Sequence, residues 1–320
     1  MKHNFLNLRQ FSATLIAILF FWGNPTSALA SKEIAAVKSK DLEIYNDVLT
    51  AFSVETKMRI IEYDMKGNLR RGQSIFQRIR SRKPLAILVI GTEAATLAAR
   101  EINDIPIIFC MVPHPERYNL SNDNITGISL SLPIKTQLAT LQTIAPSTRT
   151  VGVMYNPRYS RRLIEKAFEY SEQLGMALVP AKIDRSEDVT RGARAFLGKV
   201  DALWMVPDPT LMNSLAFRTL VDFTKKHKIP FFSISEKMVK AGALVSLSPS
   251  PSSIGRQAGK MAKKIIRQGL SPSLLPIEFP QGLEIAINLD TAKKIGVECD
   301  IALEVFTFAA RNDYKIQVYE

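Results

Sequence analysis

The chain alternates short apolar runs with segments of helical periodicity, and this alternation limits the folds open to it. In the first part, strand-like runs lie at 33–37, 58–63, 85–90 and 106–112, separated by helix-like segments at 41–53, 69–82 and 92–102. Continuous apolar runs are typical of strands buried on both faces, and apolar residues three or four apart are typical of covering helices. The pattern therefore predicts a parallel sheet between helices.

This rhythm breaks at the polar segment 113–124, restarts, and breaks again at 248–253. Between the breaks we expect helices at 132–144, 160–174, 189–197 and 213–227, and strands at 150–155, 176–181, 202–206, 230–233 and 242–247. A helix at 254–268 ends at Gly269, a good helix stop.

The fold predicted is α/β, with two doubly wound parallel-sheet lobes, a hinge and a cleft between the lobes. We expect one lobe from 31–115 with 250–275 and the other from 116–249 with 276–320. In such sheets, ligands bind at the carboxyl ends of the strands.

The first 30 residues have the pattern of a signal peptide. Lys2 and Arg9 precede the apolar run 13–22, Pro25 follows, and Ala28-Leu-Ala30 provides a cleavage site. The run is short for a membrane span, so an uncleaved anchor is the weaker alternative. Because no Cys stands at the cleavage point, a lipid anchor is disfavoured. We therefore expect a periplasmic protein.

Charge and cysteine content narrow the function further. The formal charge of +12 falls to +10 without residues 1–30, and the basic residues are spread along the chain. Export and the absence of clustered aromatic residues argue against nucleic acid as a partner. An exported protein can form a disulfide between Cys110 and Cys299. Since Cys110 lies within an apolar run, a buried thiol is the favoured prediction.

Small polar groups and turns follow the predicted strands and are the candidate ligand-binding residues. They are Ser39, Gly91, Thr92, Glu93, Pro113, His114, Tyr155, Asn156, Asp208 and Ser233. No H-E-x-x-H, P-loop, G-x-S-x-G or G-x-G-x-x-G motif occurs, and histidines are few. The residues predict a binding protein rather than an enzyme, with no catalytic residue, metal or cofactor.

Five of these residues, at four places in the sequence, have two interpretations each. A helix beginning at Thr92 leaves N–H groups that can receive a carboxylate, or Gly91 only makes the turn and Thr92 caps the helix. Asp208, between two prolines, can receive an ammonium group or serve the turn. Tyr155 can stack on a ligand or pack in the core. His114 can line the cleft or lie on the surface.

The chain resembles the ABC transporter substrate-binding proteins of the TrpX-like group, which have a type I periplasmic-binding fold. The resemblance rests on the ordered segments "AILVIGTEAATLAAREINDIPIIFCMVPHP", "NITGIS", "VGVMYNP", "VDALWMVPDPTLMN", "KIPFFSISEKMVKAGALVSLSPSPSSIGRQAGKMAKKII" and "LEIAINLDTAKKIGV". It covers nearly all of the chain after residue 30.

The resemblance implies a two-lobed receptor that closes on an amino acid or similar solute. It implies that Thr92 and Ser39 hold a carboxylate, that Asp208 pairs with an ammonium, and that Tyr155 and Asn156 line the second lobe. Relatives usually have Asp at the position of His114, and the first helix has Ala51-Phe52 in place of a glycine-containing run.

The hypothesis is an exported, monomeric solute receptor that binds a small molecule and docks on an ABC permease. The first alternative is a sensory protein that signals to a membrane partner. An exported α/β enzyme is a further alternative, and a DNA-binding repressor is disfavoured because a signal peptide stands where its DNA-binding helices would be. Under the hypothesis, Asp208→Ala abolishes binding of an amine ligand.

Overall fold

The computed structural model describes residues 31–120 and 122–320 and builds them into two sheets. The predicted signal peptide lies outside the described residues. In the described part of the chain no helix is long and apolar enough to cross a membrane.

The first sheet is wholly parallel, in the order β2-β1-β3-β4-β5. Its strands are β1 (Ser31–Lys38), β2 (Arg59–Asp64), β3 (Pro84–Ile90), β4 (Ile107–Val112) and β5 (Ile125–Ser129). Its helices are α1 (Glu43–Thr56), α2 (Leu69–Arg82), α3 (Thr92–Glu101) and α9 (Pro251–Gln268), with short 3₁₀ turns η1 (Pro115–Arg117) and η3 (Pro272–Leu274).

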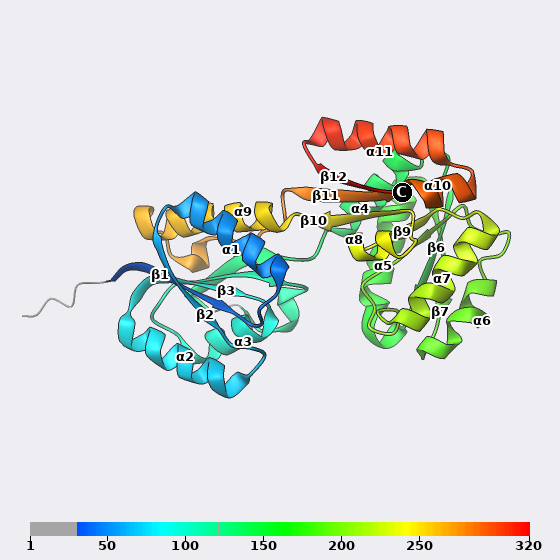
Figure 1. Ribbon diagram of the computed structural model, residues 1–320. Coiled ribbons are helices and arrows are strands. Elements are labelled where there is room, and N and C mark those ends of the chain that lie inside the picture. The colour runs from blue at the N-terminus through cyan, green and yellow to red at the C-terminus, as the bar shows by residue number, and fades with distance from the viewer. Residues whose placement is uncertain (1–30, 121) are drawn as a thin grey trace, which may run out of the picture. The chain divides into compact units, whose positions relative to one another are not determined.

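Helices cover both faces of this sheet, as Figure 1 shows: α1 and α9 lie side by side on one face, and α2 and α3 lie on the other. The α1–α9 packing is close because Gly255 has no side chain. A Cβ there would lie 2.2 Å from the Val48 carbonyl oxygen. An ion pair between Lys263 of α9 and Glu55 of α1 joins the same helices.

The second sheet has the order β12-β11-β10-β9-β8-β6-β7. Its strands are β6 (Thr150–Tyr155), β7 (Ala177–Lys182), β8 (Ala202–Trp204), β9 (Phe231–Ser233), β10 (Val245–Pro249), β11 (Leu283–Asn288) and β12 (Lys315–Tyr319). Its helices are α4 (Ile134–Ile144), α5 (Pro157–Gln173), α6 (Val189–Arg194), α7 (Ser214–His227), α8 (Glu236–Lys240), α10 (Leu289–Ile295) and α11 (Glu298–Asn312), with the 3₁₀ turn η2 (Ser186–Asp188).

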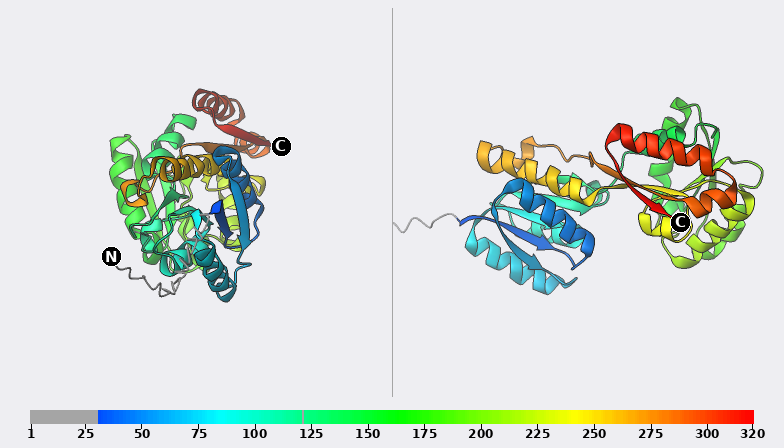
Figure 2. Two further views of the ribbon diagram at one scale, coloured as in Figure 1. Left: turned by 90° about the vertical axis from the view of Figure 1, so that its left-hand side faces the viewer. Right: turned by 45° about the horizontal axis from the view of Figure 1, so that its top comes forward.

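Two cores flank the second sheet. One contains buried residues of α4, α5 and α11, and the other contains buried residues of α6 and α7. Figure 2 gives two further views of these layers. β10 and β11 are antiparallel, so the sheet is mostly, not wholly, parallel as the alternation had predicted. The exception arises because the chain leaves this sheet at the end of β10 to form α9, and returns to that same end to begin β11.

Within the described residues, the chain passes between the sheets three times: after β5, between β10 and α9, and between η3 and β11. The third passage is tied to the first sheet, where the Glu278 N–H donates to the Gly127 carbonyl at 3.0 Å. Gln257 of α9 donates to the Glu278 carboxylate at 2.6 Å and to the Phe279 carbonyl at 3.0 Å. These bonds fix the third crossing against α9.

The α/β class and the paired sheets are confirmed. β5 extends the first sheet to residue 129, so the crossing comes later than the expected lobe boundary at residue 115. The alternation breaks at residue 113 because the polar residues after β4 lead to a short further strand of the same sheet, β5, and not to the second sheet. Cys110 is a free, buried cysteine, and burial raises the pKa of its thiol.

Candidate functional site

A cavity of about 1940 Å³ is lined by loops and helices that belong to both sheets. From the first sheet come the start of α1, the loop Pro113–Arg117 and the end of β5. From the second come one side of α5, most of α8 and the ends of β10 and β12. Drug-sized ligands occupy pockets of roughly 300–1,000 Å³, so this cavity has room beyond one small solute.

The loop after β4 is the most constrained part of the lining. Met111 near the end of β4 and His114 in the loop that follows both have left-handed backbone conformations, with φ of 58° and 50°. Residues other than glycine rarely adopt this region, and doing so costs of order 1–3 kcal/mol. Strain of this kind is concentrated at functional sites, which favours the loop as part of the site.

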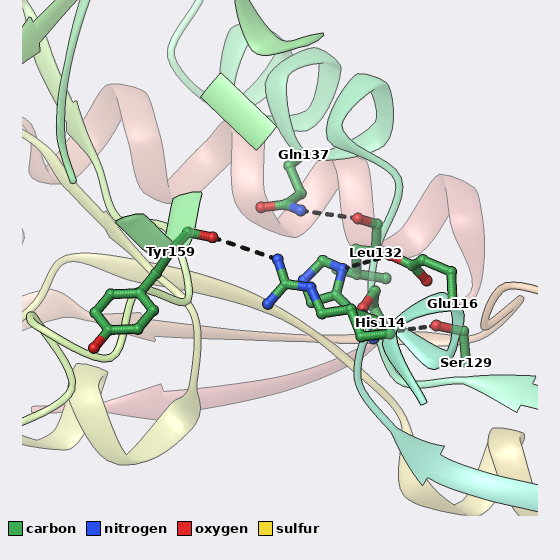
Figure 3. A network of polar contacts seen from close by, with 8 residues as sticks. His114, Glu116, Ser129, Leu132, Gln137 and Tyr159 are labelled. Carbon is green, nitrogen blue, oxygen red and sulfur yellow. Dashed lines mark hydrogen bonds and ion pairs between the residues drawn. The ribbon is translucent and has the colours of Figure 1, made fainter. Parts of the chain in front are cut away.

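A chain of hydrogen bonds holds this loop (Figure 3). The His114 N–H donates to Ser131 Oγ at 2.9 Å, and the Ser131 N–H donates to Ser129 Oγ at 3.0 Å. The His114 ring places Nδ1 3.2 Å from a Glu116 carboxylate oxygen. Pro113 and His114 thus line the cavity, and their contact with a ligand stays a prediction.

Asp208 lies in a different environment from the one expected. Its carboxylate is fully buried and accepts hydrogen bonds from the Asn156 N–H at 2.9 Å, the Ser160 hydroxyl at 2.7 Å and the Thr210 N–H at 2.9 Å. These bonds tie the end of β6 to the turn that follows β8. The carboxylate would have to leave these donors to meet a ligand ammonium.

The other candidate residues of the second sheet also make contacts that stabilise the fold. Asn156 begins α5, where its Oδ1 accepts from the Arg158 N–H at 3.0 Å, and its amide donates to the Asp184 carbonyl at 2.8 Å. Tyr155 is buried in the core, and burial raises the pKa of its phenol. Ser233 is buried and donates to the Val245 carbonyl at 3.2 Å. Of these, Asn156 lines a smaller cavity of about 510 Å³.

Ser39 and Gly91 form the start of α3. Ser39 Oγ accepts from the Ala94 N–H at 3.0 Å, so a side chain from the turn directly after β1 caps this helix. Gly91 has φ of 96°, and a Cβ there would lie 2.6 Å from both Ser39 Oγ and the Tyr45 hydroxyl. Glycine is therefore needed at this turn whether or not an anion binds there.

The next two residues leave donors at the same helix start. Glu93 pairs with Lys40 at 3.4 Å. Across residues 31–120 and 122–320, no hydrogen bond uses the N–H groups of Thr92 and Glu93. Neither residue lines the large cavity.

The sequence interpretation missed most of the lining. It did not identify Ser131, the α8 residues, or the cationic side of α5 formed by Arg162 and Lys166. The spacing of four between the last two was the available signal, because it puts both side chains on one side of a helix. No group of His, Cys, Asp or Glu in the described residues could hold a metal ion.

Comparison with known proteins identifies the family. The family model for "ABC transporter substrate binding protein" matches residues 43–310. A tyrosine-binding protein of Clostridioides difficile (strain R20291) is 28% identical over 234 residues, which are 71% of this chain and 67% of that protein.

Solved structures share the fold. The ligand-free, open structure of a substrate-binding protein with adhesive properties from Clostridium difficile has a TM-score of 0.76 and 24% identity, covering 90% of this chain and 100% of that one. The ABC domain in complex with L-Trp from Streptococcus pneumoniae has a TM-score of 0.58 and 21% identity, covering 85% and 98%. Since the family model matches most of its length, the chain belongs to the ABC transporter substrate-binding protein family.

Proposed function

We propose that this protein is the exported receptor of an ABC-type importer and binds an amino acid or similar carboxylate in the large cavity. Members of its family are solute-binding proteins and not enzymes. The tyrosine-binding relative and the L-Trp complex make aromatic amino acids the first ligands to test.

The observation that carries this proposal is the shared lining of the cavity. Residues attached to both sheets face one space, and three chain crossings connect the sheets. A ligand that contacts both sides favours the arrangement in which both sets of contacts form, and so shifts the population toward closure. The large volume fits this scheme, because closure would reduce it toward the size of the ligand.

Specific roles follow for the predicted residues. The N–H groups of Thr92 and Glu93 are suited to a carboxylate, with Ser39 and Gly91 shaping the turn that presents them. These four residues do not line the large cavity, so they would reach its ligand only in an arrangement that brings the start of α3 to the cavity. Pro113 and His114 would contact the ligand from the loop after β4. Tyr155, Asn156, Asp208 and Ser233 would shape the second side, chiefly from behind the surface.

Family membership implies a small-molecule ligand and a permease partner. We further propose that the protein acts as a monomer in the periplasm, directed there by the signal peptide. A membrane sensor is the alternative partner. If the ligand-bound protein stimulates the ATPase activity of a reconstituted permease, transport is favoured. If it causes no stimulation, signalling is favoured.

Calorimetric titration of the protein lacking residues 1–30 tests ligand binding. L-tyrosine, L-tryptophan and the other common amino acids are the probes, and we expect at least one to bind with micromolar or tighter affinity. Thr50→Trp, which narrows the cavity from α1, should weaken that binding at least tenfold. Thr143→Trp on the exposed side of α4 is the matched control, since Thr143 does not line the cavity.

Two results would contradict the proposal. One is the absence of binding to any amino acid or other carboxylate. The other is equal affinity in the two tryptophan variants, which would place the binding site outside this cavity.

A further inference from the structure

The side of the cavity formed by α5 is cationic and lacks acidic partners. Arg162 and Lys166 line it, and no ion pair or hydrogen bond within residues 31–120 and 122–320 uses either side chain. Lys135 at the start of α4 lines the same cavity, again with no carboxylate partner in the described part.

The basic and acidic residues of α5 lie on different sides of the helix. Arg162 and Lys166 line the cavity, whereas Glu165, Glu169 and Glu172 of the same helix do not. Arg162 and Lys166 are one turn apart, about 6 Å along the helix axis. Like charges at this spacing destabilise a helix, and an anion between them removes that repulsion.

A third cation comes from the first sheet. Arg117 donates to the Tyr159 carbonyl at 3.4 Å, and Tyr159 precedes Arg162 by one turn of α5. Figure 3 shows this carbonyl directed toward the loop that carries His114. Hydrogen bonds from a guanidinium to an anion are shorter and stronger than those to a neutral carbonyl. An anion at this position would therefore draw Arg117 away from the carbonyl.

Most acidic residues of the cavity are already engaged. Glu116 lies against the His114 ring, Glu236 pairs with Lys240, and Glu284 accepts from Ser250. Glu43 and Asp47 of α1 line the cavity on the first-sheet side. The lining thus offers free cations on α5 and free carboxylates on α1.

We propose that the ligand is a dicarboxylate, with acidic amino acids included, and that Arg162, Lys166 and Arg117 together hold one of its carboxylates. The inference rests on the proposed function and names the ligand class of that same cavity. A carboxylate held by Arg117 from one side and by Arg162 from the other contacts both sheets, so it provides the differential contacts that closure requires. The second carboxylate is left for Lys135, which lines the same cavity, and an ammonium, where present, for Glu43 and Asp47.

Titration with matched probes tests this inference. L-glutamate and glutarate should bind at least tenfold more tightly than L-glutamine and L-tyrosine. The double variant Arg162→Gln/Lys166→Gln should weaken L-glutamate binding by at least thirtyfold and leave L-glutamine binding within about threefold. Lys225→Gln/Lys226→Gln on α7 removes the same charge away from the cavity and should leave all affinities unchanged.

The outcomes separate the inference from the function on which it rests. Tight binding of neutral amino acids without the acidic probes would overturn the dicarboxylate class and leave the receptor function standing. L-glutamate binding that survives the α5 double variant would overturn the assignment of these side chains. Binding of none of these probes would overturn the dicarboxylate class, and the receptor function would fall with it only if the other common amino acids also failed to bind.

Discussion

Two Pro-X-Pro turns, one at each sheet, show how differently the same local pattern can be used. Pro113-His114-Pro115 follows β4, and Pro207-Asp208-Pro209 follows the strand region of β8. In the first, the middle side chain lines the large cavity, and its backbone is left-handed. In the second, the middle side chain is fully buried and accepts three hydrogen bonds.

The difference comes from what surrounds each turn. Two N–H groups and a hydroxyl converge on Asp208, and a buried carboxylate is stable only when such donors surround it. The loop of His114 is held through its backbone by Ser131, and the residue lines the cavity with its ring Nδ1 3.2 Å from a Glu116 carboxylate oxygen. A polar residue at a strand end is therefore available to a ligand only where it faces a cavity and buried donors do not already surround it.

The largest expected effect comes from Asp208→Ala. The change leaves the Asn156 N–H, the Ser160 hydroxyl and the Thr210 N–H without their acceptor. Burying unsatisfied groups of this kind costs about 1–3 kcal/mol each, so we expect the free energy of unfolding to fall by roughly 3 kcal/mol. Denaturant unfolding measures this fall.

Asp290→Ala is the control for that experiment, because it removes an exposed ion pair with Lys294. Exposed pairs contribute about 0.2–1 kcal/mol. If the Asp208→Ala variant keeps its stability but loses amine binding, the comparison of the two turns is wrong. Asp208 would then contact the ligand directly and would not mainly stabilise the fold.

A smaller effect is expected at the other turn from Ser131→Ala. The variant removes the acceptor of the His114 N–H and should lower the free energy of unfolding by about 1 kcal/mol. Hydrogen exchange at the amide of His114 should accelerate, because its partner is lost. Ser81→Ala on the exposed side of α2 is the control and should change stability by less than about 0.5 kcal/mol. Unchanged exchange at His114 would show that Ser131 does not hold the loop.

Most of the fold could be predicted from the sequence because burial on both faces leaves a strong pattern. α2 was predicted at its observed bounds, since Ile75, Phe76 and Ile79 fall on one side of an otherwise polar helix. The family resemblance is confirmed by the match over residues 43–310. β5, β11 and β12 were not predicted, because their short apolar runs lie beside proline-rich or polar segments.

The candidate site was harder to predict because exposure and hydrogen bonding depend on tertiary neighbours. Gly91 was chosen as part of a possible anion site, yet its steric need comes from Ser39 and Tyr45, which are distant in sequence. Arg162 and Lys166 looked like ordinary surface charge. Their side of α5 becomes part of a cavity only when the loop Pro113–Arg117 lies opposite, and no local pattern reports that.

The smallest expected effect tests a third strand end, where Lys38 closes β1. Its ammonium is buried and contacts Asp41 at 2.9 Å, Glu62 at 2.6 Å and Asn46 at 2.7 Å. Burial alone would lower the Lys38 pKa, but the hydrogen bonds and charges of Glu62 and Asp41 raise it overall. The hydrogen bond from Lys38 in turn lowers the pKa of Asp41 below its ordinary value of 3.8.

The sign of the pH dependence follows from that lowered pKa. A carboxyl group with a lowered folded-state pKa adds stability above its unfolded value, and this stability is lost as pH falls through the folded value. Asp41→Asn should therefore reduce stability by a small constant amount above pH 3.8. The difference from the unmodified protein should then shrink as the pH falls further. Urea unfolding across this pH range measures the difference in the free energy of unfolding between the two proteins. If that difference stays constant down to about pH 2, the ionised Asp41 carboxylate does not stabilise the fold through Lys38. Asp41 is exposed, whereas Asp208 is buried. Water can therefore replace much of the hydrogen bonding that the Asp41 carboxylate provides to Lys38, and we expect the loss of this carboxylate to destabilise the protein less than the loss of Asp208.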